Sequence, residues 1–355
     1  MNLLTSSRLH TYQRCARAHE LRYERGIVSC APAPALVFGT AVHAALEAFW
    51  RAWADGGIGA TEGALDALRG HALDDDAAIR ARVMVAAYCA RYTRLAARCD
   101  VLGVEVEFHT PIVDPDTGVA VPGWTLAGKL DALVRLEDGR VAIVEHKTAG
   151  RDVSPGSDYR TRLTLDAQIG VYFDGAEALG HPADVCLYDI LAKPAADRLR
   201  ATPVEDRRYT QPKSRACKAC KKAPGVHTED GIACTEGRIV TDPGGVLYAS
   251  QRADDETLEA FEERLLSAIE ADPDRYLVQA EIVRTDAERA ELRRDVIATL
   301  RGIELARRKG HSARSAQACF AHGRCDYLDA CLAPASLDDP HRYRRLPTIH
   351  PELTT

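Results

Sequence analysis

The sequence has no long apolar run. Its longest apolar-rich stretch, Leu36 to Trp50, is interrupted by His43 and Glu47 and is shorter than the ~18 residues that a membrane-spanning helix needs. The opening segment, MNLLTSSRLHTYQRC, also lacks the continuous apolar core behind a basic start that marks a secretory signal. These absences exclude a transmembrane segment and lead us to expect a cytoplasmic protein.

Internal repeats and low-complexity tracts are absent too, and 355 residues suffice for one large domain or two modest ones with a buried core. The cysteine count, 11, is odd. In a reducing compartment such thiols indicate core packing or metal ligation rather than disulfides. The isolated ones, Cys30, Cys89, Cys99 and Cys186, are expected to act as small apolar residues.

The net charge of −6 is unevenly distributed. Between Lys193 and Lys222 ten Lys and Arg residues stand against three acidic ones, a local charge of +7 that leaves −13 for the rest of the chain. Such a strip is either a solvated face or a surface that a phosphate backbone selects. The candidate contacts with a nucleic acid are Lys193, Arg198, Arg200, Arg207, Arg208, Lys213 and Arg215.

Hydrophobic periodicity predicts an α/β fold with a central mixed sheet flanked by helices. The predicted helices are 7–23, 36–55, 61–71, 76–98, 164–180, 254–271 and 285–309. The predicted strands are 103–110, 124–136, 140–148, 184–192 and 277–285. We expect a single domain made of an N-terminal helical part (1–100), a sheet and helix (101–192), a basic cysteine-containing insertion (193–250), a further strand with helices (251–335) and a tail (336–355).

The strands 124–136 and 140–148 flank Glu137-Asp138-Gly139, which predicts a β-hairpin. A two-residue turn would place Asp131 and Glu145 on different faces. A three-residue loop with a left-handed Gly139 pairs Leu136 with Arg140 and places the two carboxylates opposite each other. We predict the second arrangement.

Opposed carboxylates repel each other unless a cation lies between them, so this pair favours a hard-metal site. Period-2 alternation adds Lys147 to the face of Glu145. Carboxylate oxygens suit Mg²⁺ or Mn²⁺, which lowers the pKa of a nearby water, while an ammonium group orients that water or neutralises charge. On the hairpin alone, a surface salt-bridge cluster is an equally good explanation.

Two helices supply further candidates by i, i+4 spacing. His43 and Glu47 are the polar residues of an otherwise apolar helix, where burial favours a metal ligand at His43 assisted by Glu47 over a plain contact between the two. Gln168 and Tyr172 share a face of the helix predicted over 164–180, and alone they indicate no more than a core aromatic with a polar rim.

In order and spacing, these motifs resemble the RecB-like branch of the PD-(D/E)XK nucleases. The motifs are Gly39-Thr40-Ala41-Val42-His43 with Glu47, Gly128-Lys129-Leu130-Asp131, Val144-Glu145-His146-Lys147-Thr148 and Gln168-x3-Tyr172. Leu130 stands where the family name has Pro, a frequent departure in this branch.

The resemblance implies a restriction-endonuclease-like core that binds one or two Mg²⁺ or Mn²⁺ ions. The implied ligands are the side chains of His43, Asp131 and Glu145 and the main-chain carbonyl of His146. Lys147 would be the catalytic base or the group that orients water. Gln168 and Tyr172 would support catalysis or contact DNA.

A subset of the family carries a [4Fe-4S] cluster held by one cysteine before the nuclease core and three after it. The resemblance implies Cys15, Cys319, Cys325 and Cys331 as these ligands. The trailing C-x5-C-x5-C spacing departs from the better-known C-x2-C-x5-C, so a zinc ion on four thiolates remains an alternative. Either metal would join the N- and C-terminal helical segments, roughly 300 residues apart, and convert its binding energy into folding energy.

A second thiol group, Cys217 and Cys220 with His227 and Cys234, lies in the basic insertion and is a candidate for a structural Zn²⁺. The expected function is a metal-dependent DNA nuclease, an exonuclease on single strands or DNA ends, in recombination, repair, phage replication or CRISPR adaptation with partner proteins of that machinery. The alternatives are a non-catalytic DNA-binding or assembly subunit that keeps the fold, and a restriction-like endonuclease.

Overall fold

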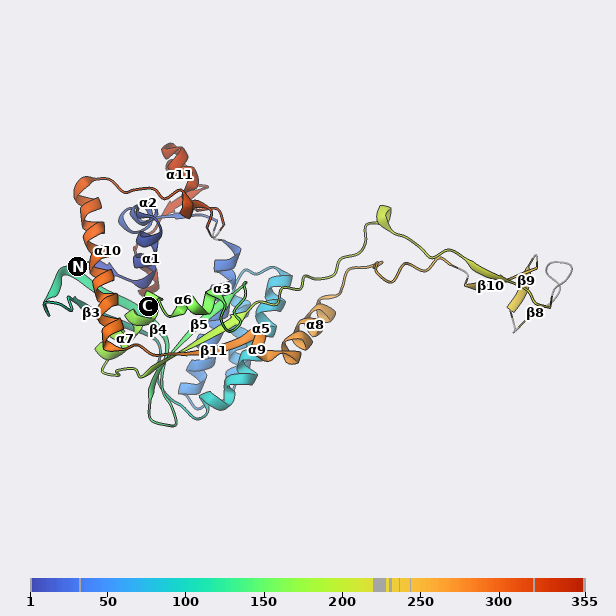
Figure 1. Cartoon of the computed structure of the whole chain (residues 1–355), viewed down its shortest axis with the longest axis horizontal. Coiled ribbons are helices and arrows are strands. Elements are labelled where there is room, and N and C mark those ends of the chain that lie inside the picture. The colour runs from blue at the N-terminus through green and yellow to red at the C-terminus, as the bar shows by residue number, and fades with distance from the viewer. Residues whose placement is uncertain are drawn as a thin grey trace. The chain divides into compact units, whose positions relative to one another are not determined.

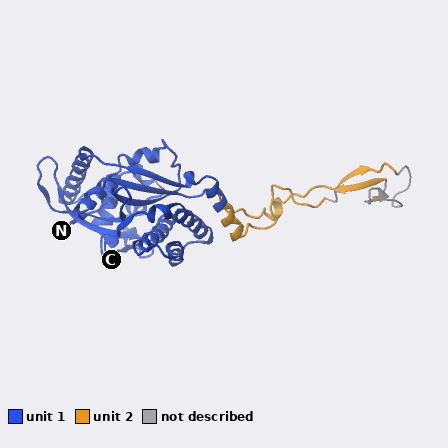
Figure 2. Ribbon diagram, turned by 90° about the horizontal axis from the view of Figure 1, so that it is seen from below, with its two compact units in different colours: residues 1–195, 265–355 blue, residues 196–264 orange. Residues whose placement is uncertain are grey.

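The computed structural model describes residues 2–31, 33–219, 228–229, 232–235, 237–242, 244–321 and 323–353. The chain forms two compact units (Figure 2). One consists of residues 1–195 and 265–355, and the other of residues 196–264. The first unit contains both ends of the chain and all the strands predicted from the sequence.

The first unit is built on a six-stranded mixed sheet (Figure 1). Its strands are β1 (Asn2–Leu4), β3 (Asp100–Val113), β4 (Ala120–Arg135), β5 (Val141–Ala149), β6 (Val185–Ala192) and β11 (Leu277–Ile282). β5 pairs antiparallel with β4 and parallel with β6, and β11 is antiparallel to β6. The five predicted strands and the mixed α/β fold are confirmed, whereas β1 was not predicted. This short strand pairs in parallel with Trp124–Leu126 of β4.

Helices cover both faces of this sheet, because alternate strand residues are apolar on each face. Ile143 and Cys186 belong to the core under α7 and α10, while Val144 and Leu187 belong to the core under α3 and α5. The helices of the first unit are α1 (Ser6–Arg14), α2 (Ala16–His19), α3 (Pro34–Ala54), α4 (Ala60–Ala67), α5 (Asp75–Ala96), α6 (Asp158–Leu163), α7 (Ala167–Ala178), α9 (Pro273–Tyr276), α10 (Asp286–Lys309) and α11 (Leu328–Leu332).

The first predicted helix, 7–23, is wrong as a continuous element. The chain is extended at Cys15, with φ −162° and ψ 112°, and then resumes as α2 and a π-helical turn over Glu20–Glu24. The main-chain N–H of Arg17 donates to the carbonyl of Ala313, 3.0 Å away. This tertiary hydrogen bond lies beside the break. Cys15 is the extended residue between the two helices.

The hairpin between β4 and β5 has the predicted three-residue loop. The N–H of Leu136 donates to the carbonyl of Arg140 at 2.8 Å, and Gly139 is left-handed with φ +89°. The ladder pairs Arg135 with Val141 and Ala132 with Val144. The ladder ends there, so the predicted pair of Asp131 and Glu145 lies one step beyond its last pair.

Segments from both ends of the chain also pair with each other. β2 (Ile27–Ser29) is antiparallel to β12 (Tyr343–Arg345), and the ring of Tyr327 stacks on that of Tyr343. The hydroxyl of Tyr327 donates to the carbonyl of Ile27 at 2.8 Å.

Among the described helices, none combines the length and apolar character that a bilayer crossing requires.

The second unit contains a sheet with the strand order β7-β10-β9-β8. Its strands are β7 (Lys213–Ala216), β8 (Thr228–Glu229), β9 (Ile232–Thr235) and β10 (Arg238–Asp242), and α8 (Leu258–Ala271) begins within it. Carboxylates tie its incoming and outgoing segments together. Glu256 accepts from the N–H of Leu199 at 2.9 Å and pairs with Arg264, while Asp255 accepts from the N–H of Ala201 at 2.7 Å.

Candidate active site

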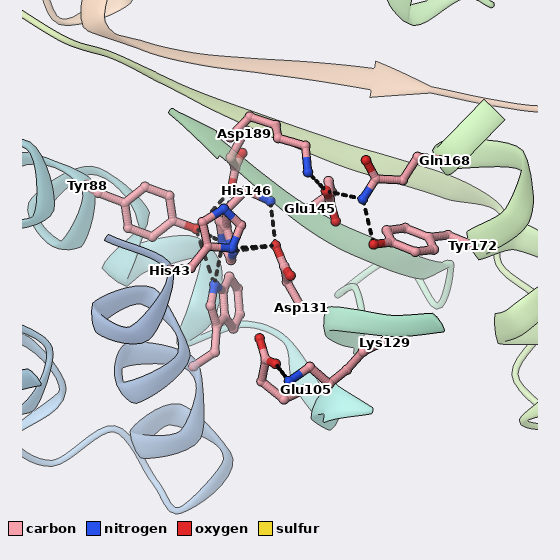
Figure 3. Close-up of polar contacts among 12 residues, drawn as sticks. His43, Tyr88, Glu105, Lys129, Asp131, Glu145, His146, Gln168, Tyr172 and Asp189 are labelled. Carbon is pink, nitrogen blue, oxygen red and sulfur yellow. Dashed lines mark hydrogen bonds and ion pairs between the residues drawn. The ribbon is translucent and has the colours of Figure 1, made fainter. Parts of the chain in front are cut away.

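The predicted acidic residues lie where β4 and β5 separate (Figure 3). Ladder pairing ends at Ala132 and Val144, one step before Asp131 and Glu145. Beyond that point the main-chain N–H of His146 donates to Asp131 Oδ2 at 2.9 Å. A side-chain carboxylate thus takes a main-chain donor at the point where the two strands part.

Glu145 is the centre of a hydrogen-bonded group formed by β5 and α7. Its Oε1 accepts from the ammonium of Lys147 and, at 2.9 Å, from the amide of Gln168. The same amide of Gln168 also donates to the hydroxyl of Tyr172 at 2.6 Å. The structure therefore brings together the four residues that the sequence had suggested from β5 and α7.

The second oxygen of Glu145 is buried and has no hydrogen-bond partner. Burial, and after it the negative charge of Asp131, raises the pKa of Glu145 above its usual range. A buried carboxylate oxygen without a donor is costly, because it has lost its hydration without compensation. A divalent cation is a ligand that would satisfy it.

His43, on α3, faces the other acidic residue. Its Nδ1 lies 3.6 Å from Asp131 Oδ2. Burial lowers the pKa of His43 to about 4, so at neutral pH the ring is uncharged, the form that ligates metals. Among the described residues no hydrogen bond or ion pair joins Glu47 to His43, and Glu47 pairs with Arg51 at 2.8 Å.

Asp131 remains ionised in this environment. Burial alone would raise the pKa of its carboxyl, but the hydrogen bond from His146 and the neighbouring nitrogens of His43 and His146 together hold that pKa below its usual range. Oδ2 is the oxygen that these nitrogens surround. Oδ1 is therefore the oxygen left to bind a cation.

The donor set fits a hard divalent cation. The set consists of two carboxylates, one main-chain carbonyl and one neutral imidazole. Most of its donors are oxygens, the ligands that Mg²⁺ and Mn²⁺ prefer. In the described ranges no three side chains of His, Cys, Asp or Glu already form a metal cage. Glu145 Oε1 is directed to Lys147 and Gln168, whereas Asp131 Oδ2 is directed to the two histidines.

The side chain of His146 is a feature of the candidate site that the sequence analysis missed. It is 2% exposed, and its Nδ1 lies 3.3 Å from Asp131 Oδ2. Its Nε2 lies 3.0 Å from the hydroxyl of Tyr88, which itself donates to Asp189 at 2.8 Å. Burial alone would lower the pKa of His146, but Asp131 and Asp189 raise it overall.

Glu105 on β3 was also missed. It is the one non-glycine residue with a positive φ in the described chain, +52°, and its carboxylate pairs with the ammonium of Lys129. Burial, together with Asp131 and Glu47, raises its pKa. The available signal was its place within the predicted strand 103–110, and in the structure its neighbours Val104 and Val106 pair with Ala132 and Leu130, on either side of Asp131.

The predicted nucleic-acid contacts divide between the two units. Lys193 belongs to the first unit, and its ammonium lies 3.6 Å from the centre of the Phe38 ring. In the second unit Arg200 pairs with Asp255, and Arg207 donates to the carbonyls of Thr202 and Ala253. Arg200 and Arg207 thus help to hold the segments of this unit together. The other members of the set, all in the second unit, are Arg198, Arg208, Lys213 and Arg215.

Cys15, Cys319, Cys325 and Cys331 come near one another, and all four are free thiols. Burial raises the pKa of Cys331, and the other three cysteines raise it further, which places all of them within electrostatic reach. The N–H of Cys325 donates to the carbonyl of Cys319 at 2.8 Å, and Gly323, with φ +88°, lies between them. Within the described residues these thiols do not form a finished metal site.

The second predicted thiol group is only partly described. Cys217 and Cys234 are buried against Ile239 in the sheet of the second unit. Cys220 and His227 lie outside the described residues.

A mixed sheet whose central strands part at an Asp and a Glu-x-Lys motif, beside a helix carrying Gln168 and Tyr172, defines the class of metal-dependent nucleases. Residues 3–332 match the model of the PD-(D/E)XK nuclease superfamily, and the chain belongs to that superfamily. Its members are generally nucleases that typically use Mg²⁺ or Mn²⁺, which supports a hydrolytic nuclease with DNA as substrate. No curated protein was found to match the chain.

Proposed function

We propose that the protein is a Mg²⁺- or Mn²⁺-dependent deoxyribonuclease of the RecB-like branch that degrades single-stranded DNA or DNA ends. The observation that supports this most is the buried, unpartnered oxygen of Glu145 beside the ion pair with Lys147. Asp131 and His43 complete a cation-binding set. The protein would act in recombination, repair, phage replication or CRISPR adaptation, together with partner proteins of that machinery.

Asp131, Glu145, His43 and the carbonyl of His146 would hold the cation, which lowers the pKa of an attacking water and neutralises phosphate charge when bound. Lys147 is already hydrogen-bonded to Glu145. We therefore assign it the role of a cation that orients water and attracts the scissile phosphate, rather than that of a base. Gln168 keeps Glu145 in place through its amide.

The second unit would follow the DNA backbone through its basic residues. Binding driven by phosphate neutralisation weakens steeply as salt concentration rises. The [4Fe-4S] cluster on Cys15, Cys319, Cys325 and Cys331 would join the two ends of the first unit, and the pairing of β2 with β12 already brings those ends together. A structural Zn²⁺ in the second unit would be held by a thiol group that includes the buried Cys217 and Cys234.

The test is the degradation of end-labelled single- and double-stranded DNA with Mg²⁺ or Mn²⁺. The native chain should degrade it, Glu145→Ala and Lys147→Ala should lose at least ~100-fold in kcat, and Glu259→Ala, an exposed acidic residue, should match the native chain. Equal activity in all four proteins would contradict the assignment of Glu145 and Lys147 to the active site.

Circular DNA, single-stranded and duplex, separates the remaining alternatives. An exonuclease leaves them intact, whereas a restriction-like enzyme cuts closed duplex circles at defined positions. A native chain that binds DNA but cleaves neither linear nor circular forms with either metal would support the non-catalytic assembly subunit. The intact Asp131, Glu145 and Lys147 argue against that alternative.

A further inference from the structure

A buried chain of hydrogen bonds and ion-pair contacts leads from Tyr88, on α5, to Asp131 (Figure 3). His146 and Asp189 are register partners on β5 and β6. Tyr88, on α5, donates its hydroxyl to Asp189 Oδ2 at 2.8 Å and lies 3.0 Å from His146 Nε2. The far side of the His146 ring then reaches Asp131 Oδ2.

Two further side chains, Trp50 and Gln279, donate hydrogen bonds to members of this chain. Trp50 Nε1 lies 3.2 Å from both the hydroxyl of Tyr88 and His146 Nε2. The side-chain amide of Gln279, on β11, donates to Asp189 Oδ1 at 2.8 Å. Neither oxygen of Asp189 is left without a partner, and each ring nitrogen of His146 lies near a partner.

Tyr88, His146 and Asp189 are each at most 2% exposed. Their neighbours on this face of the sheet are apolar, among them Phe49, Val144 and Leu187. Burying three polar side chains here stabilises the fold no better than apolar residues of similar size would. The functional consequence of the network is at its open end, where His146 holds one oxygen of Asp131 and leaves the other for a cation.

We propose that Tyr88, Asp189 and His146 act as a positioning relay that fixes the carboxylate of Asp131 for divalent-cation binding, an inference that rests on the proposed function. His146 supplies two nitrogens to Asp131 Oδ2, its main-chain N–H and its Nδ1. Tyr88 and Asp189 hold the opposite edge of the ring. Without them the ring can rotate, and cation binding must then order both His146 and Asp131.

Tyr88→Phe removes the hydroxyl and keeps the ring. Partners that orient metal ligands typically contribute ~10- to 100-fold in metal affinity. In calorimetric titrations of the metal-free protein, Tyr88→Phe should therefore bind Mn²⁺ ~10-fold or more weakly than the native chain. In DNA degradation it should require correspondingly more Mn²⁺ for half-maximal rate, with an unchanged KM for DNA.

Tyr92→Phe is the matched control, because Tyr92 is a buried phenol whose ring centre lies 4.5 Å from that of Tyr88, while its hydroxyl makes no hydrogen bond to the described members of the relay. It should bind Mn²⁺ like the native chain. Asp189→Asn keeps the shape of the side chain and should also weaken Mn²⁺ binding; it provides a second test where Tyr88→Phe is too unstable to purify.

Native Mn²⁺ affinity in both relay variants would overturn the inference, whatever their stability. The titration also separates this inference from the proposed function. A native chain that binds Mn²⁺ through the relay but degrades no DNA contradicts the function alone. An active native chain whose relay variants bind Mn²⁺ with unchanged affinity contradicts the relay alone.

Discussion

Gln168 on α7 donates its side-chain amide to Glu145 Oε1 on β5 at 2.9 Å, and the same amide reaches the hydroxyl of Tyr172 at 2.6 Å. Lys147 donates to the same oxygen of Glu145. With Oε1 held by two donors, Oε2 is left without a partner in a buried position. The helix therefore determines which oxygen of Glu145 is available to a cation.

From this arrangement we predict that Gln168→Leu lowers kcat by ~10- to 100-fold, because Glu145 loses its neutral donor while the ion pair with Lys147 remains. Tyr172→Phe should cost less, since the hydroxyl of Tyr172 hydrogen-bonds to Gln168, which in turn donates to Glu145. Both are measured as initial rates on labelled DNA at saturating Mg²⁺. A larger loss for Tyr172→Phe than for Gln168→Leu would show that Tyr172 acts on the substrate directly.

A second prediction concerns Phe108, whose ring lies between two glycines. A Cβ added at Gly175 would lie 2.5 Å from the ring, and one at Gly128 would lie 2.7 Å from it. The ring also packs edge to face on Tyr172 at 6.3 Å. Gly175→Ala should therefore lower the free energy of unfolding by about 1–3 kcal/mol, the usual cost of overpacking a filled core.

Urea denaturation measures this effect. Gly63→Ala on α4 is the control, since nothing lies within 4 Å of the added Cβ. In an open helical position Ala is favoured over Gly, and the control should gain about 0.5–1 kcal/mol. The same midpoint for native chain and Gly175→Ala would mean that Phe108 moves without cost.

A third prediction tests the four-thiolate site. Cys15→Ala should release iron from anaerobically purified protein and lower the melting temperature before it affects kcat, because metal binding by ligands from both ends of the chain contributes to folding. Cys30→Ala is the control, because Cys30 is exposed and its thiol donates to the carbonyl of Pro340, outside the four-thiolate group. Iron analysis and thermal denaturation give the two readouts.

Colourless protein that contains zinc would assign the site to Zn²⁺ instead. Native protein with neither metal, and a Cys15→Ala variant with an unchanged melting temperature, would contradict both forms of the site.

Local sequence signals predicted the hairpin and much of the candidate site. Glu137-Asp138-Gly139 determines a loop with a left-handed glycine, and the loop determines the register that places Asp131 and Glu145 just beyond the end of the ladder. The i, i+4 spacing of Gln168 and Tyr172 placed them on one helical face in the same way. These features depend on residues close in sequence, where propensity and spacing are informative.

Features that depend on tertiary contacts were not predictable. Tyr88 lies 58 residues before His146 and has the sequence character of an ordinary core aromatic. The three-residue strand β1 exists through its pairing with Trp124–Leu126, and the break at Cys15 adjoins the hydrogen bond between Arg17 and Ala313. Nor does a propensity scale anticipate the left-handed backbone of Glu105.

The last prediction concerns His19, a buried residue away from the candidate site. Its Nε2 accepts from the guanidinium of Arg8 at 3.1 Å, so its ring must be neutral at that nitrogen. Burial, and after it the positive charge of Arg8, lowers the pKa of His19 to about 4. An unfolded histidine titrates near 6.5.

Between pH 6.5 and pH 4 the unfolded chain therefore binds a proton at His19 that the folded chain does not bind. The free energy of unfolding must fall as the pH falls through this window, by up to about 3 kcal/mol from this group. His19→Gln keeps an acceptor for Arg8 and removes the titration. Its stability relative to the native chain should rise as the pH is lowered from 6.5 to 4, in urea denaturation under reducing conditions. His311→Gln, at an exposed position, should follow the native chain. A constant difference between His19→Gln and the native chain across this range would show that His19 is protonated in the folded protein, with Arg8 displaced from it.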